Sequence, residues 1–194
     1  MTLKPVSAGL LAALAGLAWA CGPVRAQEAP QAPAAPPEIK TVGDWQVRCF
    51  AVKNSHPCDL FQEMANKDTK QRILSFSLAY DPSLDRHLMQ ITVPLDVALQ
   101  KGVTIQTDNY TSPAIKYRMC TREGCFVQTV PDNAMVDALT KASANAKVNI
   151  VGDNGKAYGL QFSLKGFSAA HDDMVSQARA KGVTAPKAAN TAKP

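Results

Sequence analysis

Two closely spaced pairs of cysteines constrain the fold of this 194-residue chain more than any other feature. Cys49 and Cys58 are separated by nine positions, and Cys120 and Cys125 by five. A disulfide requires two Cα atoms within roughly 7 Å, which each local pair can meet across a single hairpin. Four cysteines allow three pairings. The short spacings favour the two local bridges, and the other pairings stay open.

The N-terminus carries the features of an export signal. Lys4 precedes an unbroken apolar run over residues 8–20, and Val24-Arg25-Ala26 then has the form of a cleavage site. This order of regions predicts a secretory signal peptide over residues 1–26. The run is shorter than the roughly 20 apolar residues that a bilayer span needs. We therefore expect no membrane span, and a periplasmic or cell-surface/secreted location, where disulfides persist.

The fifth cysteine, Cys21, raises an alternative to cleavage after Ala26. Ala18-Trp19-Ala20-Cys21 resembles a lipoprotein processing site, in which Cys21 would carry the lipid and anchor the chain. The fit is poor, because Ala18 stands where leucine is usual and Trp19 is bulky where a small residue is usual. Cleavage is therefore favoured over lipid anchoring.

The cysteine spacings argue against metal or redox chemistry. A zinc site usually uses Cys-x-x-Cys spacing or histidine partners, and a redox pair usually has two intervening residues. Here the spacings are wider, and the three histidines, His56, His87 and His171, are scattered along the chain. We expect structural disulfides, no metal ion and no cofactor.

Composition divides the chain after the signal peptide into three segments. Residues 27–40 are rich in proline and alanine, which predicts an extended linker. Residues 179–194 are rich in lysine, alanine, proline and threonine, which predicts a disordered tail. Residues 41–178 would form one β-domain. Loss of residues 1–26 removes two positive charges and lowers the net charge from +5 to +3. So small a basic excess argues against nucleic-acid binding.

Short runs of alternating polarity, separated by turn residues, dominate the predicted domain. This pattern predicts an antiparallel β-sandwich, with a partly open barrel as the alternative, because strand order cannot be read from one sequence. Helical periodicity is confined to residues 132–142 and 168–180. The predicted strands cover residues 45–50, 58–64, 73–80, 88–93, 103–108, 114–119, 126–130, 147–151 and 158–164.

No group of residues has a pattern typical of catalysis. Asp85 and His87 could act as an orienting carboxylate and a base, but no nucleophile lies in a recognisable turn nearby, so a surface histidine is the simpler interpretation. His171, Asp172 and Asp173 could bind a metal, but successive helical residues point in different directions. We predict a protein that is not an enzyme and has no catalytic residues.

An ordered set of short motifs extends over residues 41–174. The motifs cover residues 43–49 (GDWQVRC), Pro57-Cys58, Gln62, residues 91–95, 117–120 and 124–125, and residues 162–170 (FSLKGFSAA). This order resembles the invasion-associated locus B family of exported proteins, named after a locus linked to entry into host cells. The pattern departs at Met119, where Arg would adjoin Cys120, and this predicts a local shift in the loop. The resemblance implies an immunoglobulin-like β-sandwich, the same four-cysteine framework, an envelope location and no catalytic residues.

These observations predict a protein that binds an envelope or host-cell component through a sheet face or loop rim, with a contribution to host-cell invasion. Arg118, Arg122 and Glu123 at the rim of the Cys120–Cys125 loop are the candidate binding residues, because exposed loops commonly carry binding. The simpler alternative is that they are solvated turn charges. A second functional hypothesis is a structural or assembly factor for outer-membrane integrity, with outer-membrane association and no direct host role.

Overall fold

The computed structural model describes residues 35–51, 54–142 and 144–182. Antiparallel strands dominate this part of the chain, and two α-helices follow the later strands, as the sequence predicts. The elements are β1 (Glu38–Val42), β2 (Trp45–Cys49), β3 (Cys58–Ala65), β4 (Arg72–Asp81), β5 (Arg86–Val93), the 3-10 turn η1 (Leu99–Lys101), β6 (Thr104–Gln106), β7 (Tyr117–Thr121), β8 (Gly124–Thr129), α1 (Asn133–Lys141), β9 (Asn145–Val151), β10 (Ala157–Ser163) and α2 (Phe167–Lys181).

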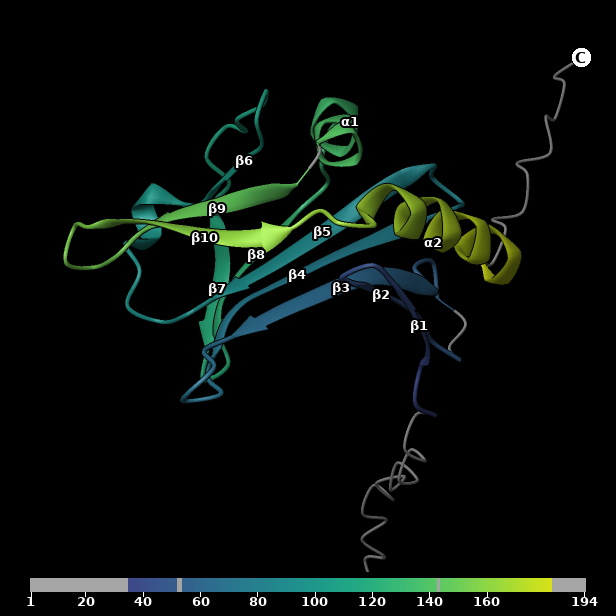
Figure 1. Cartoon of the computed structure of the whole chain (residues 1–194), viewed down its shortest axis with the longest axis horizontal. Coiled ribbons are helices and arrows are strands. Elements are labelled where there is room, and N and C mark those ends of the chain that lie inside the picture. Colours follow the sequence, from purple (N-terminus) through teal and green to yellow (C-terminus); the bar gives the residue numbers. More distant parts are fainter. Residues whose placement is uncertain (1–34, 52–53, 143, 183–194) are drawn as a thin grey trace, which may run out of the picture. The chain divides into compact units, whose positions relative to one another are not determined.

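The strands form two antiparallel sheets (Figure 1). The large sheet has the order β1-β2-β3-β4-β5-β8-β7, and the small sheet has the order β10-β9-β6. Each of β1 to β4 pairs with the strand that follows it in the chain, as short turns between alternating strands favour. The mainly β, antiparallel fold predicted from the sequence is therefore confirmed. The immunoglobulin-like topology remains a prediction.

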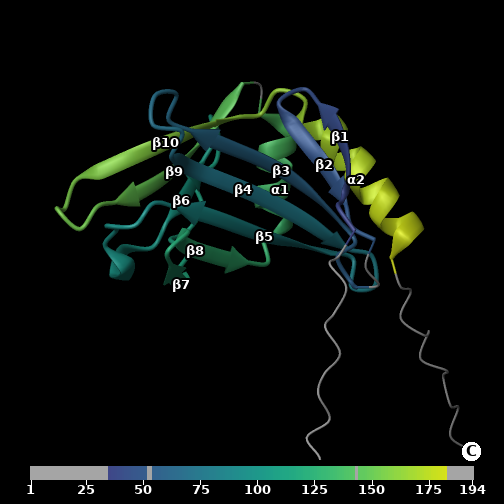
Figure 2. The ribbon, with the colours of Figure 1, turned by 90° about the horizontal axis from the view of Figure 1, so that it is seen from below.

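One face of the large sheet carries the apolar residues of β2 to β5 and β8 and forms the core. Phe76 of β4 stacks on Phe162 of β10 with ring centroids 5.0 Å apart, and Trp45 of β2 meets Phe162 edge-on. Helix α2 packs over β1 to β4 and against α1. Figure 2 shows the opposite face of β3, β4 and β5, with both helices behind the strands. The small sheet and α2 thus bury one shared core.

A buried glutamine links three segments that lie far apart in the sequence. The Gln62 amide donates to the carbonyls of Asp44 (3.0 Å) and Ser163 (3.2 Å), and its oxygen accepts from the Ser163 backbone N–H (2.9 Å). Trp45 Nε1 also donates to the Ser163 carbonyl at 3.0 Å. Because buried polar groups need partners, this network fixes the β1–β2 turn against the end of β10.

Two glycines allow the same turn to touch the start of α2. Gly43 and Gly166 both have positive φ, +60° and +80°. A Cβ on Gly43 would lie 2.4 Å from the Lys165 carbonyl oxygen, and one on Gly166 would lie 2.8 Å from that of Val42. The first and last motifs of the domain, GDWQVRC and FSLKGFSAA, are therefore in direct contact through these two glycines.

Both disulfides join residues that are paired directly in the strand register. Cys49 is bonded to Cys58 between β2 and β3, and Cys120 to Cys125 between β7 and β8. This is the local pairing favoured by the cysteine spacing. Loops this short reduce the entropy of the unfolded chain enough to stabilise the fold by roughly 2–3 kcal/mol each. The first bridge is buried under α2, with the Gln177 amide oxygen 3.4 Å from Cys49 Sγ.

The structure differs from the sequence predictions at the ends of the domain. Strand β1 begins at Glu38, inside the predicted linker, and α2 continues to Lys181, inside the predicted tail. The register shifts between Tyr117 and Met119, at the position where the family pattern is interrupted. The predicted signal peptide and Cys21 lie outside the described residues. Neither helix of the described domain is long and apolar enough to span a bilayer.

Candidate functional site

The β7–β8 hairpin presents two of the three predicted binding residues, Arg122 and Glu123, at its tip. Thr121 pairs with Gly124, so Arg122 and Glu123 form the two-residue turn. The bridge between Cys120 and Cys125 closes the hairpin directly behind this turn. Gly124 has φ +134°, and a Cβ there would lie 2.4 Å from the Val93 carbonyl oxygen, so the hairpin lies against the end of β5.

A charged hollow of about 360 Å³ lies beside this turn. Its charged lining residues are Arg72, Asp96, Arg122 and Glu123. Arg72 Nη2 donates to Glu123 Oε2 at 2.8 Å, and its buried Nε lies 3.9 Å from Glu63 Oε2. Arg122 forms no ion pair within the described part of the chain. The hollow therefore offers one guanidinium, that of Arg122, that is not engaged by a carboxylate of the described residues.

An apolar hollow of about 270 Å³ adjoins the charged one and shares Pro94, Leu95 and Asp96 with it. It lies between the segment that follows β5 and the β9–β10 hairpin. Leu95 is 46% exposed and Tyr158 is 42% exposed. Exposed apolar side chains that gather beside polar groups are typical of interaction sites. Its other lining residues are Val97, Ile150, Gly152, Asp153, Asn154 and Leu160.

Backbone contacts hold the two walls of the apolar hollow together. The Ala98 N–H donates to the Val151 carbonyl at 2.8 Å, and the Asp153 N–H donates to the Asp96 carbonyl at 2.9 Å. Val97 and Gly152 form an antiparallel bridge. The segment after β5 is thus pinned to the β9–β10 hairpin, and this side of the hollow is preformed.

We call the two adjoining hollows the rim groove, lined by Gln71, Arg72, Pro94–Val97, Arg122–Gly124, Ile150, Gly152–Asn154, Tyr158 and Leu160. In both views the β9–β10 hairpin lies at the opposite end of the described domain from the start of β1 and the end of α2 (Figures 1 and 2). The apolar part of the groove is therefore remote from the first strand and from the end of the last helix of the described domain.

The structure separates the three predicted binding residues. Arg122 and Glu123 line the rim groove, whereas Arg118 is exposed on the edge strand β7 and lines neither hollow. Glu123 is held by Arg72, which no sequence pattern indicated because Arg72 lies 51 positions away. The apolar half of the groove was also missed, because its residues come from segments that only the tertiary fold brings together.

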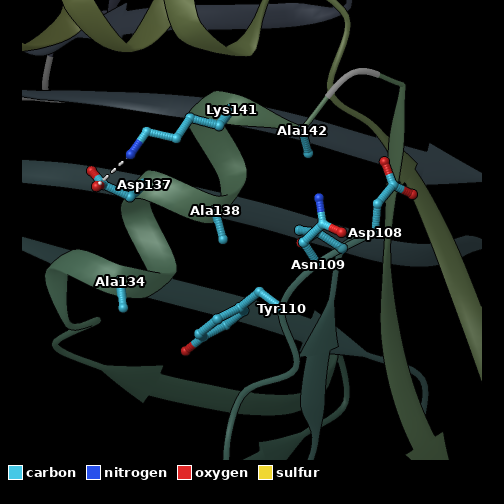
Figure 3. A pocket seen from close by; sticks show the side chains of 9 residues that line it. Asp108, Asn109, Tyr110, Ala134, Asp137, Ala138, Lys141 and Ala142 are labelled. Carbon is cyan, nitrogen blue, oxygen red and sulfur yellow. Dashed lines mark hydrogen bonds and ion pairs between the residues drawn. The ribbon is translucent and has the colours of Figure 1, made fainter.

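A third hollow, of about 370 Å³, lies between α1 and the segment that follows β6, Thr107–Tyr110 (Figure 3). Its carboxylate Asp137 is already paired with Lys141 at 2.9 Å, within one turn of the helix. Burial raises the pKa of Tyr110, whose hydroxyl points away from Asp108 and Asn109 (Figure 3). No histidine or cysteine lines this hollow, and its polar groups do not converge. It is therefore the weaker candidate.

The structure brings together two histidines that the sequence analysis treated separately. His87 Nε2 of β5 lies 2.9 Å from His171 Nε2 of α2. The surface position preferred for His87 is wrong, because the residue is half-buried on β5. Asp85, weighed as its orienting carboxylate, accepts a hydrogen bond from the Tyr80 hydroxyl. Burial, and then the proximity of His171, lower the pKa of His87 to about 4. Neither imidazole lines any hollow named above, and the described residues contain no cluster of three or more His, Cys, Asp or Glu side chains suited to a metal ion.

Comparisons with known proteins agree with the fold and the motifs. The family model described as "Invasion associated locus B (IalB) protein" matches residues 45–175. Two relatives, invasion protein B homologs of Brucella abortus strain 2308 and of Brucella abortus biovar 1 strain 9-941, are each 29% identical over 136 residues, which cover 69% of this chain and 76% of each relative.

A solved structure has the same fold. The crystal structure of invasion associated protein b from Bartonella henselae superposes with a TM-score of 0.63 at 22% identity, and the match covers 72% of this chain and 97% of that one. The residues matched by the family model include all four disulfide cysteines, Gln62 and its partner Ser163. The chain therefore belongs to the invasion associated locus B family.

Proposed function

We propose that this protein is exported by cleavage of residues 1–26 and acts as a non-enzymatic binding protein of the cell envelope or cell surface. The rim groove would be its binding site, and the partner would be a protein segment of an envelope or host-cell component. The relatives carry invasion in their names, so a contribution to host-cell invasion is part of this proposal.

An apolar slot beside the unpaired Arg122 guanidinium carries the proposal. The slot suits one or two large apolar side chains, because about 270 Å³ is the size of a small hydrophobic pocket. The Arg122 guanidinium suits a backbone carbonyl or a carboxylate next to that anchor. Apolar anchors with neighbouring arginine contacts are common where proteins bind one another.

The lining of the groove supports a binding role rather than catalysis. It contains no histidine, cysteine, serine or threonine that could act as a nucleophile or as a base near neutral pH. Its carboxylates are Asp96, Glu123 and Asp153, and Glu123 is engaged by Arg72. These side chains are suited to binding a partner through charge and apolar contact.

Site-specific photo-cross-linking in living cells tests the proposal. A photoreactive residue at Leu95 is expected to capture a discrete partner, identified by mass spectrometry. The matched control is Ile39 on β1, which is similarly exposed at 56% but lies at the other end of the domain. An outer-membrane component as partner would favour the role in outer-membrane integrity. A host surface protein would favour invasion.

The Arg122→Glu change provides the second part of this prediction. Loss of a charge-assisted contact is expected to lower the cross-link yield from Leu95 by about tenfold. Arg118→Glu on the same hairpin makes the same charge change outside the groove and is expected to leave the yield unchanged. Equal labelling from positions 95 and 39, or equal effects of the two arginine variants, would contradict binding at the rim groove.

A further inference from the structure

We propose that His87 and His171 form a proton-operated clasp, which holds α2 on the large sheet near neutral pH and loosens the helix on acidification. The device links the sheet to the last helix of the fold. It involves no residue of the rim groove, so the clasp and the proposed binding function can be tested separately.

The geometry of the pair limits its protonation. With Nε2 atoms 2.9 Å apart, one imidazole must donate its N–H and the other must accept with its lone pair. One added proton can be shared by the pair. A second would leave two N–H groups facing each other and place two positive charges at hydrogen-bond distance. The doubly protonated pair therefore cannot keep this contact.

The surroundings of the pair limit the access of water that could relieve that conflict. His171 is only 15% exposed. The Tyr80 ring of β4 lies 5.2 Å from the His87 ring, and the Phe167 ring of α2 lies 6.2 Å from that of His171. Aromatic side chains from both the sheet and the helix thus flank the pair.

The charged groups nearby are already engaged or solvated. Asp172, beside His171 Nδ1 at 3.3 Å, is 80% exposed, so its charge is screened by water. Asp85, on the turn between β4 and β5, accepts from the Tyr80 hydroxyl and pairs with Arg179 at 3.4 Å. No carboxylate among the described residues forms an ion pair with His87. The charge of Asp85 favours protonated His87, but it is the smallest of the influences on the His87 pKa.

The direction of the pH effect follows from the neutral form of His87. In the folded domain, burial and then the charge of His171 lower the pKa of His87 from 6.5 to about 4, against a smaller opposing effect of Asp85. The docked helix therefore favours the unprotonated ring. Docking is fully favourable above about pH 6.5, weakens as the pH falls towards about 4, and changes no further below that.

Other contacts of α2 also respond to acid and must be separated from the clasp. Lys40 pairs with Asp173 at 3.1 Å, Lys181 pairs with Glu38, and Arg179 pairs with Asp85. Carboxyl groups as a class titrate near pH 4. The window from about pH 7 to about pH 5 leaves carboxylates ionised while an undocked histidine gains its proton.

Amide hydrogen exchange of the full chain, followed by mass spectrometry, tests the clasp. After correction for intrinsic rates, exchange in α2 is expected to rise by about tenfold between about pH 7 and about pH 5. His87→Gln keeps a neutral hydrogen-bonding group and is expected to abolish that rise. The matched control is His56→Gln, which removes the remaining histidine, near Asp81, and is expected to leave the rise intact.

Imidazole nitrogen NMR on the unmodified chain gives a readout that does not depend on any variant. The clasp predicts one donor and one acceptor Nε2 near pH 7, and a His87 ring that resists protonation at about pH 5. An α2 exchange rate that does not change with pH, an unaltered response in His87→Gln, or ordinary titration of both rings would each overturn the proposal.

Discussion

At the scale of single residues, the Gln62 network shows why a motif residue that performs no chemistry is needed. Its amide pairs with the carbonyls of Asp44 and Ser163 and with the Ser163 backbone N–H, and the Ser163 carbonyl also accepts from Trp45 Nε1. The sequence places Gln62 only as one member of an ordered motif set. Its partners lie 18 and 101 positions away, and no local pattern could identify them.

Replacement of Gln62 by leucine is therefore expected to lower the free energy of unfolding by about 1–3 kcal/mol, because buried polar groups lose their partners. The matched control is Gln46→Leu, on the exposed side of β2, which is expected to stay within about 0.5 kcal/mol. Urea unfolding followed by tryptophan fluorescence measures both, since Trp45 shares the Ser163 carbonyl with Gln62. Equal losses in the two variants would contradict a structural role for this network.

At the scale of elements, the β1–β2 turn and the β10–α2 connection meet through two glycines. This contact explains why the first and the last motif of the domain occur in the same ordered set. Gly43 and Gly166 each combine positive φ with a backbone atom closer than a Cβ allows. A hairpin at one end of the domain is thereby joined to a helix at the other.

Gly43→Ala is expected to cost more than Gly155→Ala, although both positions have positive φ, +60° and +78°. The strain of a left-handed alanine is about 1–2 kcal/mol at either site. At Gly43 a Cβ also overlaps the Lys165 carbonyl, and overpacking adds about 1–3 kcal/mol. Nothing lies within 4 Å of a Cβ at Gly155. Chemical denaturation compares the two variants, and similar losses would show that the close approach is not tight.

The predicted elements were located correctly where local chemistry specifies them. Asp132 accepts a hydrogen bond from the Met135 N–H and starts α1 (Asn133–Lys141) inside the range predicted from helical periodicity. The prediction missed β1 (Glu38–Val42), because most of its residues are exposed and it shows no apolar alternation. Such an edge strand exists only because β2 supplies its hydrogen-bond partners.

At the scale of the whole molecule, α2 (Phe167–Lys181) closes the part of the core face that the small sheet leaves open. Its sequence has a thin apolar stripe, yet Phe167, Ala170, Met174 and Ala178 are all buried. Small residues in this stripe let the helix approach the sheet closely. The clasp between His87 and His171 lies at the same interface, so acidification would weaken the docking of α2 on the large sheet.

A chain that ends at Gly166 is therefore expected to lose cooperative unfolding. Burial of Phe167 and Met174 alone contributes about 1.5–3 kcal/mol each, a large share of the roughly 5–15 kcal/mol that stabilises a domain. A chain that ends at Gly182 keeps the whole of α2 and is expected to unfold cooperatively, as the full chain does. Scanning calorimetry compares the three, and a sharp transition in the shorter chain would show that the two sheets fold without the helix.

The local properties of this protein can be predicted from its amino-acid order. Cysteine spacing, turn residues and alternating polarity predicted short antiparallel strands, local disulfides and two helices, because each depends on neighbours within a few positions. The contacts between distant groups arise only when the chain packs. Strand order, the rim groove beside Arg122, and the contact between His87 and His171, 84 positions apart, all arise from packing two sheets and a helix around one core. Packing depends on the shapes of many side chains together, so no local pattern in the chain encodes it.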